Sequence, residues 1–227
     1  MHRIVIAIFG ILALGAPGAA RAALTFTAGV GGVPSVSGAT LEDFNGASPS
    51  LLTLSLSGAA LVTGTALDES YMAPVFSGGT AAFFGEPVAL DGSDDSQYVA
   101  VWDGSATLSF STPQNYLGLL WGSVGTGNLL TFYDSANNEI GTISGTGIFA
   151  AFGDSQPPTG TAYVNIISDT PFSSVVATDV NDAFEFDDVA YGQVAVVPEP
   201  ATTVAGALLL LPFCASTLRK LRKSRSA

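Results

Sequence analysis

The chain has 227 residues, with 7 Lys and Arg, 19 Asp and Glu, 1 His and 1 Cys. Every basic residue, the histidine and the cysteine fall within residues 1–22 or 197–227, so residues 23–196 carry 18 acidic residues and a formal charge of −18. Without His, Cys, Lys or Arg, this middle part excludes Ser-His-Asp and Cys-His catalysis, His- or Cys-based zinc sites, disulfides, and nucleic-acid binding through neutralised phosphates.

The first 22 residues have the three parts of a signal peptide for export. Met1-His2-Arg3 is a charged start, Ile4–Leu14 is an apolar run, and Ala20-Arg21-Ala22 is a cleavage site with small residues at both critical positions. The apolar run is too short to span a bilayer. We therefore expect cleavage after Ala22 and export across the inner membrane.

Residues 23–196 are expected to form one exported domain of the all-β class. Apolar and polar residues alternate in short runs such as Leu52–Leu56, Ala106–Phe110 and Tyr163–Ile167, which Gly, Pro, Asn and Asp separate. Alternation at period two is typical of antiparallel strands joined by turns. About ten to twelve strands at this spacing favour an antiparallel β-sandwich or jelly roll.

Two segments in the middle of the chain allow sharper predictions. Tyr116–Trp121 is apolar on both faces except at Gly118, which predicts a central strand covered on both sides. The runs Leu129–Tyr133 and Glu139–Ser144 flank Asn137-Asn138, which predicts a β-hairpin.

The acidic residues make Ca²⁺ a candidate ligand, because this ion takes six to eight oxygen ligands from carboxylates, carbonyls and waters. One candidate group lies in a Gly-containing loop, and another joins the last strand to an acid from an early strand. The candidate calcium ligands are Asp91, Asp94 and Asp95 in the loop, and Asp187, Asp188 and Glu42, with Asp43 as the alternative to Glu42. The competing interpretation is solvated turns, in which Asp supplies local backbone hydrogen bonds.

Adjacent acidic pairs also raise the question of glycoside hydrolysis, which needs two carboxylates about 5 to 10 Å apart across a sugar site. The pairs are Glu42-Asp43, Asp68-Glu69, Asp94-Asp95 and Asp187-Asp188. Neighbouring residues of a strand point to opposite faces, so we expect no adjacent pair to form such a site alone. A carboxylate-based hydrolase therefore needs acids from distant strands.

Exposed aromatic rings supply stacking platforms for sugars, and Trp102 and Tyr98 are the candidates. Trp102 precedes Asp103-Gly104, so we expect a turn beside it. Trp121 and Tyr116 instead belong to an apolar strand, and core packing is the better interpretation for them because large aromatic side chains dominate cores.

The last 31 residues, 197–227, form a tripartite tail. Val197-Pro198-Glu199-Pro200 interrupts the chain, and Ala201–Leu218 follows without a charge. A stretch of about 18 apolar residues can just span a bilayer as a helix. The basic cluster behind it, which should stay cytoplasmic, includes Arg219, Lys220, Arg222 and Lys223.

This tail resembles the PEP-CTERM sorting signal of Gram-negative bacteria. The resemblance implies an exosortase, a membrane-embedded cysteine protease, as the processing partner. The middle of the chain also resembles a family of exosortase-dependent surface proteins, in four segments: Tyr116–Ser123, Asn128–Tyr133, Tyr163–Asn165 and Ala183–Tyr191. Where that family carries Asp-Thr-Tyr-Asn, this chain reads Gly125-Thr126-Gly127-Asn128.

The function expected from these features is that of a non-enzymatic secreted protein of the cell surface, outer envelope or extracellular matrix. Exosortase systems are associated with exopolysaccharide production, so the resemblance implies polysaccharide as a partner and a carbohydrate-binding or adhesive module. The alternatives are the carboxylate-based glycoside hydrolase and an inert acidic matrix protein. The tail is expected to hold the chain in the inner membrane before processing.

Overall fold

The computed structural model of the chain describes residues 22–46, 52–64, 66–67, 71–180 and 183–194. The predicted signal peptide, apart from its last residue, lies outside the described residues, as does the sorting tail with Val197, Pro198, Glu199, Pro200, Arg219, Lys220, Arg222 and Lys223. Among the residues that are described, no helix is long and apolar enough to cross a membrane.

Strands dominate the described residues, which confirms the all-β prediction. In chain order the strands are β1 (Leu24–Gly29), β2 (Thr40–Glu42), β3 (Leu52–Thr63), β4 (Ala66–Leu67), β5 (Tyr71–Met72), β6 (Gln97–Gly122), β7 (Leu129–Tyr133), β8 (Glu139–Ser144), β9 (Ala162–Thr178) and β10 (Phe184–Gly192). The helices are α1 (Thr80–Phe84), α2 (Gly145–Ala151) and the short 3₁₀ turn η1 (Pro158–Gly160).

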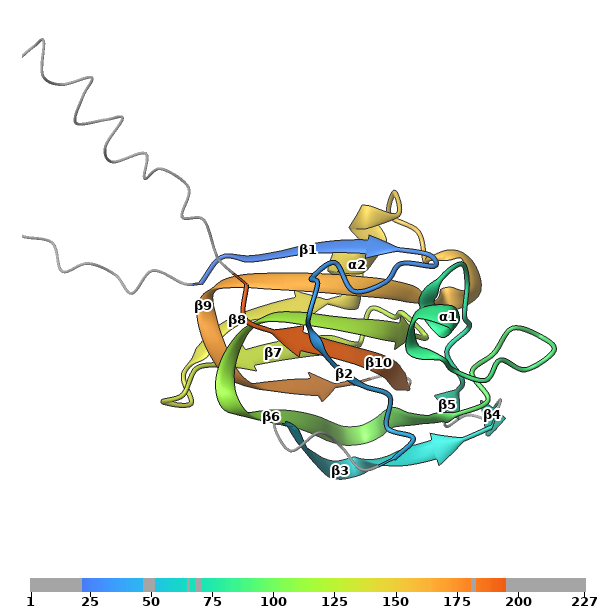
Figure 1. The fold of residues 1–227 in the computed structure, drawn as a ribbon, viewed down its shortest axis with the longest axis horizontal. Helices are drawn as coiled ribbons and strands as arrows, with labels where there is room; N and C mark the ends of the chain where they lie inside the picture. Colours follow the sequence, from blue (N-terminus) through green and yellow to red (C-terminus); the bar gives the residue numbers. More distant parts are fainter. Residues whose placement is uncertain (1–21, 47–51, 65, 68–70, 181–182, 195–227) are drawn as a thin grey trace, which may run out of the picture.

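The two longest strands, β6 and β9, run through both halves of the domain. Ser105 of β6 pairs with Thr178 of β9, and after an interruption Tyr116 pairs with Ile167, so the same two strands meet twice. Each strand bends between these pairings and continues in the other half (Figure 1). The resulting order is β2-β10-β6-β9-β7-β8, with β1 added beside β9 and β3 beside β6, in a sandwich-like arrangement. A jelly-roll topology stays a prediction.

The hydrophobic core confirms the central strand predicted at Tyr116–Trp121. That part of β6 is buried throughout and lies between β9 and β10. Trp121 is fully buried and stacks on Phe184 of β10, with ring centroids 4.5 Å apart. Its indole N–H donates to Asn128 Oδ1 at 3.1 Å, so the one polar atom of the ring is satisfied inside the core.

The predicted hairpin is also confirmed, with β7 paired to β8 from Leu129–Ser144 to Tyr133–Glu139. Asp134 holds its turn closed, because its carboxylate accepts hydrogen bonds from the backbone N–H groups of Ala136 and Asn138 at 2.9 and 2.8 Å. Asn137 adopts a φ of 62°, a left-handed conformation that Asn tolerates better than most residues.

The contrast between buried and exposed leucines gives a direct test of this core. Replacing the fully buried Leu117 of β6 with Ala should lower the free energy of unfolding by about 2–5 kcal/mol, because apolar contacts are lost and a cavity remains. The matched control, Leu90→Ala, changes a fully exposed side chain and should shift stability by less than about 0.5 kcal/mol. Urea denaturation of the full chain measures the free energy of unfolding of both variants, and equal losses would contradict the burial of Leu117.

Candidate functional site

Strand β10 carries three buried acids, Glu185, Asp187 and Asp188, although strand alternation would bury only every second residue. The core-facing residues of β10 are Phe184, Phe186, Val189 and Tyr191. Their spacing of two, three and two residues shows that the strand gains one extra residue between Phe186 and Val189.

The extra residue of β10 is a β-bulge at Asp188. Asp187 pairs with Leu120 of β6, but the next paired residue, Ala190, faces Gly118, so three steps on β10 match two on β6. Asp188 has a φ of 50°, within the left-handed region. Asp187 and Asp188 therefore both lie on the face of β10 opposite the core. The expectation that adjacent acids point to opposite faces is wrong at this pair, because it assumed an unbroken strand.

The segment before β6 covers this face of β10 and adds a third acid, Asp94, which is fully buried. The backbone N–H of Asp94 donates to Pro74 O at 2.9 Å, and Asp94 Oδ1 accepts from the backbone N–H of Ser96 at 2.7 Å and from its hydroxyl. The same hydroxyl oxygen of Ser96 lies 3.5 Å from Asp187 Oδ2. Ser96 therefore links Asp94 of the loop to Asp187 of the strand.

We call Asp94, Asp187 and Asp188 the carboxyl cluster. Four of its six carboxyl oxygens are buried without a hydrogen-bond partner: Asp94 Oδ2, Asp187 Oδ1, and both Oδ1 and Oδ2 of Asp188. Residues 23–196 contain no Lys, Arg or His that could neutralise them. Burying a carboxylate without a partner is strongly unfavourable, so these groups need either protons or a cation.

Burial dominates the electrostatics of the carboxyl cluster. It raises the pKa of Asp187 well above its ordinary value, and the neighbouring carboxyl groups of Asp94 and Asp188 add to the effect. Burial also raises the pKa of Asp188 to about 9, assisted by the charges of Glu86, Asp94 and Asp43. The charges of Glu86 and Asp43 thus act on the cluster.

The cluster unites residues that the sequence had placed in two separate calcium groups, and it leaves others out. Asp91 is exposed and caps its own loop, accepting from the Ser93 backbone N–H at 3.0 Å and from its hydroxyl at 2.6 Å. Asp95 is also exposed, so the loop does not gather three carboxylates around one point.

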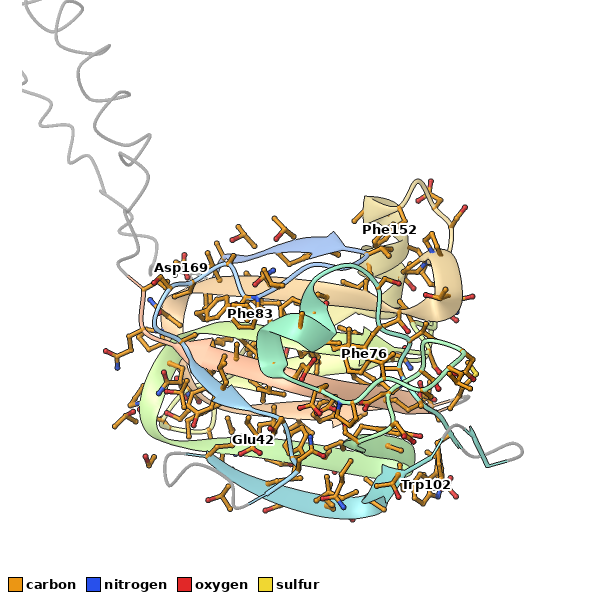
Figure 2. All side chains as sticks on the ribbon, turned by 45° about the vertical axis from the view of Figure 1, so that its right-hand side comes forward. Glu42, Phe76, Phe83, Trp102, Phe152 and Asp169 are labelled. Atoms are coloured by element: carbon orange, nitrogen blue, oxygen red, sulfur yellow. The ribbon has the colours of Figure 1, made fainter. Side chains whose placement is uncertain are left out.

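The third predicted partner, Glu42, lies on β2 beside Val189 of β10 (Figure 2). Its Oε1 accepts from the backbone N–H of Phe44 at 2.8 Å, and its Oε2 is buried without a partner. Ser96 and Glu86 were not predicted. Ser96 directly follows Asp94-Asp95 but carries no carboxylate, and Glu86 stands apart from the acidic runs in sequence. As the side chains stand in the described part of the chain, no three His, Cys, Asp or Glu form a ready metal site.

A second candidate site is a groove of about 550 Å³ beside β5. Its polar wall is formed by Ser123, Gln156, Thr159 and Asp179, and Met72 supplies an apolar surface. Hydrogen bonds hold the wall in shape: Gln156 Nε2 donates to Val124 O at 2.9 Å, and the backbone N–H of Val124 donates to Gly160 O at 2.8 Å.

An aromatic pair is formed by Trp102 of β6 and by Tyr71 of β5, the residue that precedes the groove-lining Met72. Trp102 is 37% exposed and its ring lies 6.2 Å from that of Tyr71, tilted by 33°. It stands at the rim of the molecule, far from Phe83 on α1 (Figure 2). No turn follows Trp102, because β6 continues through Asp103-Gly104 with a pairing irregularity opposite.

Tyr98 is not a second platform, and its prediction as a sugar-stacking residue is wrong. The side chain is fully buried, with its hydroxyl donating to Gly64 O at 2.7 Å. Its ring packs edge-on against Tyr71 at 6.2 Å, so Tyr98 supports the aromatic pair from beneath.

Comparisons with known proteins identify no family for the chain. No protein-family model matches it, and no curated protein matches it. Among solved structures, the enzymatically active domain of bacteriophage CBA120 tailspike protein 4 is similar over 71% of this chain and 22% of that chain, with 16% sequence identity and a TM-score of 0.31. A TM-score this low carries no inference about fold or function.

The raised pKa values predict how stability depends on pH when a chelator removes metal ions. Acids whose pKa is higher in the folded than in the unfolded state stabilise the fold fully below the unfolded pKa, and this stabilisation is lost as pH rises. The free energy of unfolding should therefore fall between about pH 4 and about pH 9, by at most about 1.4 kcal/mol per pH unit for each titrating group.

Denaturation midpoints measured across this range in EDTA test that prediction. Asp188→Asn removes one titrating group, so its profile should be flatter than that of the unsubstituted chain and its stability higher at alkaline pH. A stability that rises with pH over the same interval would show that the cluster is not the dominant titrating unit.

Proposed function

We propose that the chain is an exported bacterial surface protein whose β-sandwich domain binds carbohydrate without enzymatic activity. The observation that carries the proposal is the pair formed by the exposed Trp102 and the partly buried Tyr71, together with the polar groove that Met72 lines. Aromatic faces stack on the apolar faces of sugars, while hydroxyl, amide and carboxylate groups bind their hydroxyls. The two surfaces are one residue apart in the chain, since Tyr71 of the aromatic pair precedes Met72 of the groove.

The position of the acids supports binding over hydrolysis. A glycoside hydrolase needs two carboxylates that flank the scissile bond. Asp179 is the acid that lines the groove, and one of its oxygens accepts from Asn128 Nδ2 at 2.5 Å. A second acid next to the groove, Glu185, is fully buried and its Oε1 accepts from the backbone N–H of Met72 at 2.9 Å, so a sugar ring cannot reach it.

The proposed location rests on the two ends of the sequence. In this proposal, the signal peptide at residues 1–22 directs export of the domain at residues 23–196. An exosortase then recognises the tail at residues 197–227 through its Val197-Pro198-Glu199-Pro200 stretch. The strongly acidic, Lys- and Arg-free domain argues against nucleic acid as a partner, since the phosphates and the acids repel one another.

Affinity electrophoresis on a panel of polysaccharides tests the binding site. The full chain, kept in a detergent without a sugar head group, should be retarded by at least one polysaccharide. Trp102→Ala should lose about tenfold or more in affinity, as expected when about 1.5–3 kcal/mol of buried aromatic contact disappears. Trp102→Phe should retain part of the affinity, because an aromatic ring remains.

The matched control for that loss is Phe83→Ala, which removes another exposed aromatic side chain at a distant position. It should migrate like the unsubstituted chain. Retardation by no polysaccharide would exclude the binding module and leave the inert acidic matrix role, and release of reducing ends from any polysaccharide would exclude the non-enzymatic assignment.

The sorting proposal has its own test, the intact mass of the protein recovered from its native host. We expect a mature form that starts at Ala23 and lacks residues 201–227. Replacing Pro198, Glu199 and Pro200 together with Ala should leave the tail attached and the chain in the inner membrane. A native mature form that retains the tail would contradict exosortase processing.

A further inference from the structure

The carboxyl cluster is the least compensated part of the described structure. Asp94, Asp187 and Asp188 are each less than 1% exposed, yet four of their carboxyl oxygens have no hydrogen-bond partner. The fold builds this arrangement from two segments more than ninety residues apart, and it uses a bulge with a left-handed residue to aim two successive acids at the same side. A surface exposed to water has no need of such an arrangement.

We propose that a divalent cation of the Ca²⁺ class binds between the 93–96 loop and the bulge of β10, with Asp94, Asp187 and Asp188 as its carboxylate ligands. The unpartnered oxygens of these three residues point to a ligand that accepts electron pairs, because residues 23–196 contain no Lys, Arg or His that could pair with them. The Ser96 hydroxyl oxygen, 3.5 Å from Asp187 Oδ2, and waters would complete the shell.

The chemistry of the ligands favours Ca²⁺ over other biological cations. All of them are hard oxygens, and residues 23–196 offer neither the His nor the Cys that zinc sites use. Ca²⁺ accepts irregular geometry with six to eight oxygens, whereas Mg²⁺ demands a near-ideal octahedron. Since no three acids yet form a ready metal site, binding has to draw the carboxylates together by side-chain rotation.

The ion would hold the segment that covers β10, residues 73–96, against the sheet. Between Met72 and β6 this segment has little regular structure: the short helix α1 and the isolated bridges Val75–Ser93 and Val88–Asp94. Asp94 lies on this segment and Asp187 and Asp188 lie on β10, so a shared ion joins the two directly. The inference is independent of carbohydrate binding, because it concerns a different set of residues.

The test compares melting of the chelator-treated full chain at neutral pH with and without Ca²⁺. At a Ca²⁺ concentration about a hundredfold above the dissociation constant, the melting temperature should rise by about 5–10 °C. Calorimetric titration of the same sample should show one ion per chain. NaCl at equal ionic strength is the necessary control, because a domain with a charge of −18 gains stability from screening alone.

Two isosteric variants place the ion. Asp188→Asn should melt at the same temperature with and without Ca²⁺ and should lose the one-ion titration. Asp154→Asn, an exposed acid that also has a positive φ, should keep the full response. Asp187→Asn replaces Asp188→Asn in the comparison if the latter does not melt cooperatively.

Either of two results would overturn the inference. One is an unsubstituted chain whose melting temperature responds to Ca²⁺ no more than to NaCl, which would mean that protons neutralise the cluster. The other is a full Ca²⁺ response in the Asp188 and Asp187 variants, which would place the ion elsewhere. Both results leave the Trp102 experiments untouched, so the two proposals can fail separately.

Discussion

The extra residue at Asp188 is the constraint on which the unusual features of this domain depend. Without it, β10 would alternate regularly and one of its adjacent acids would point into the core beside Phe186. The bulge keeps Phe186 and Val189 on the core side and moves both acids to the opposite face. The core therefore stays apolar, while the acids gather on the other side of the strand.

That group of acids explains why β10 is covered by a segment with so little regular structure. The covering segment is held by specific polar contacts, such as the Ser96 hydroxyl with Asp187 Oδ2 at 3.5 Å and the backbone N–H of Met72 with Glu185 Oε1 at 2.9 Å. These contacts place Asp94 against β10 and Tyr71 against Tyr98. Tyr71 of the aromatic pair and Asp94 of the carboxyl cluster thus lie near the two ends of the segment that precedes β6.

Local patterns in the sequence predicted the strands but not the way the layers meet. The hairpin β7–β8 and the central strand at Tyr116–Trp121 were predictable, because each depends on neighbouring residues. Tyr98 was not, because its burial depends on Tyr71 and Ala73 covering a face that period-two alternation leaves open. The bulge at Asp188 and the approach of Asp94 to Asp187 depend on contacts across most of the chain, which no local pattern records.

The paired bends of β6 and β9 have a consequence for how the domain reaches its folded state. Because both strands belong to both halves, neither half can form its sheet without fixing part of the other, which favours a single cooperative transition. Their pairing joins residues as far apart as Ser105 and Thr178, and β1 pairs with β9 across a still longer separation. Domains dominated by such distant contacts fold in about milliseconds to seconds, since long loops must close before any contact forms. A chain delivered across a membrane would therefore spend that interval with its strand edges open, and its high negative charge would keep neighbouring copies apart while it folds.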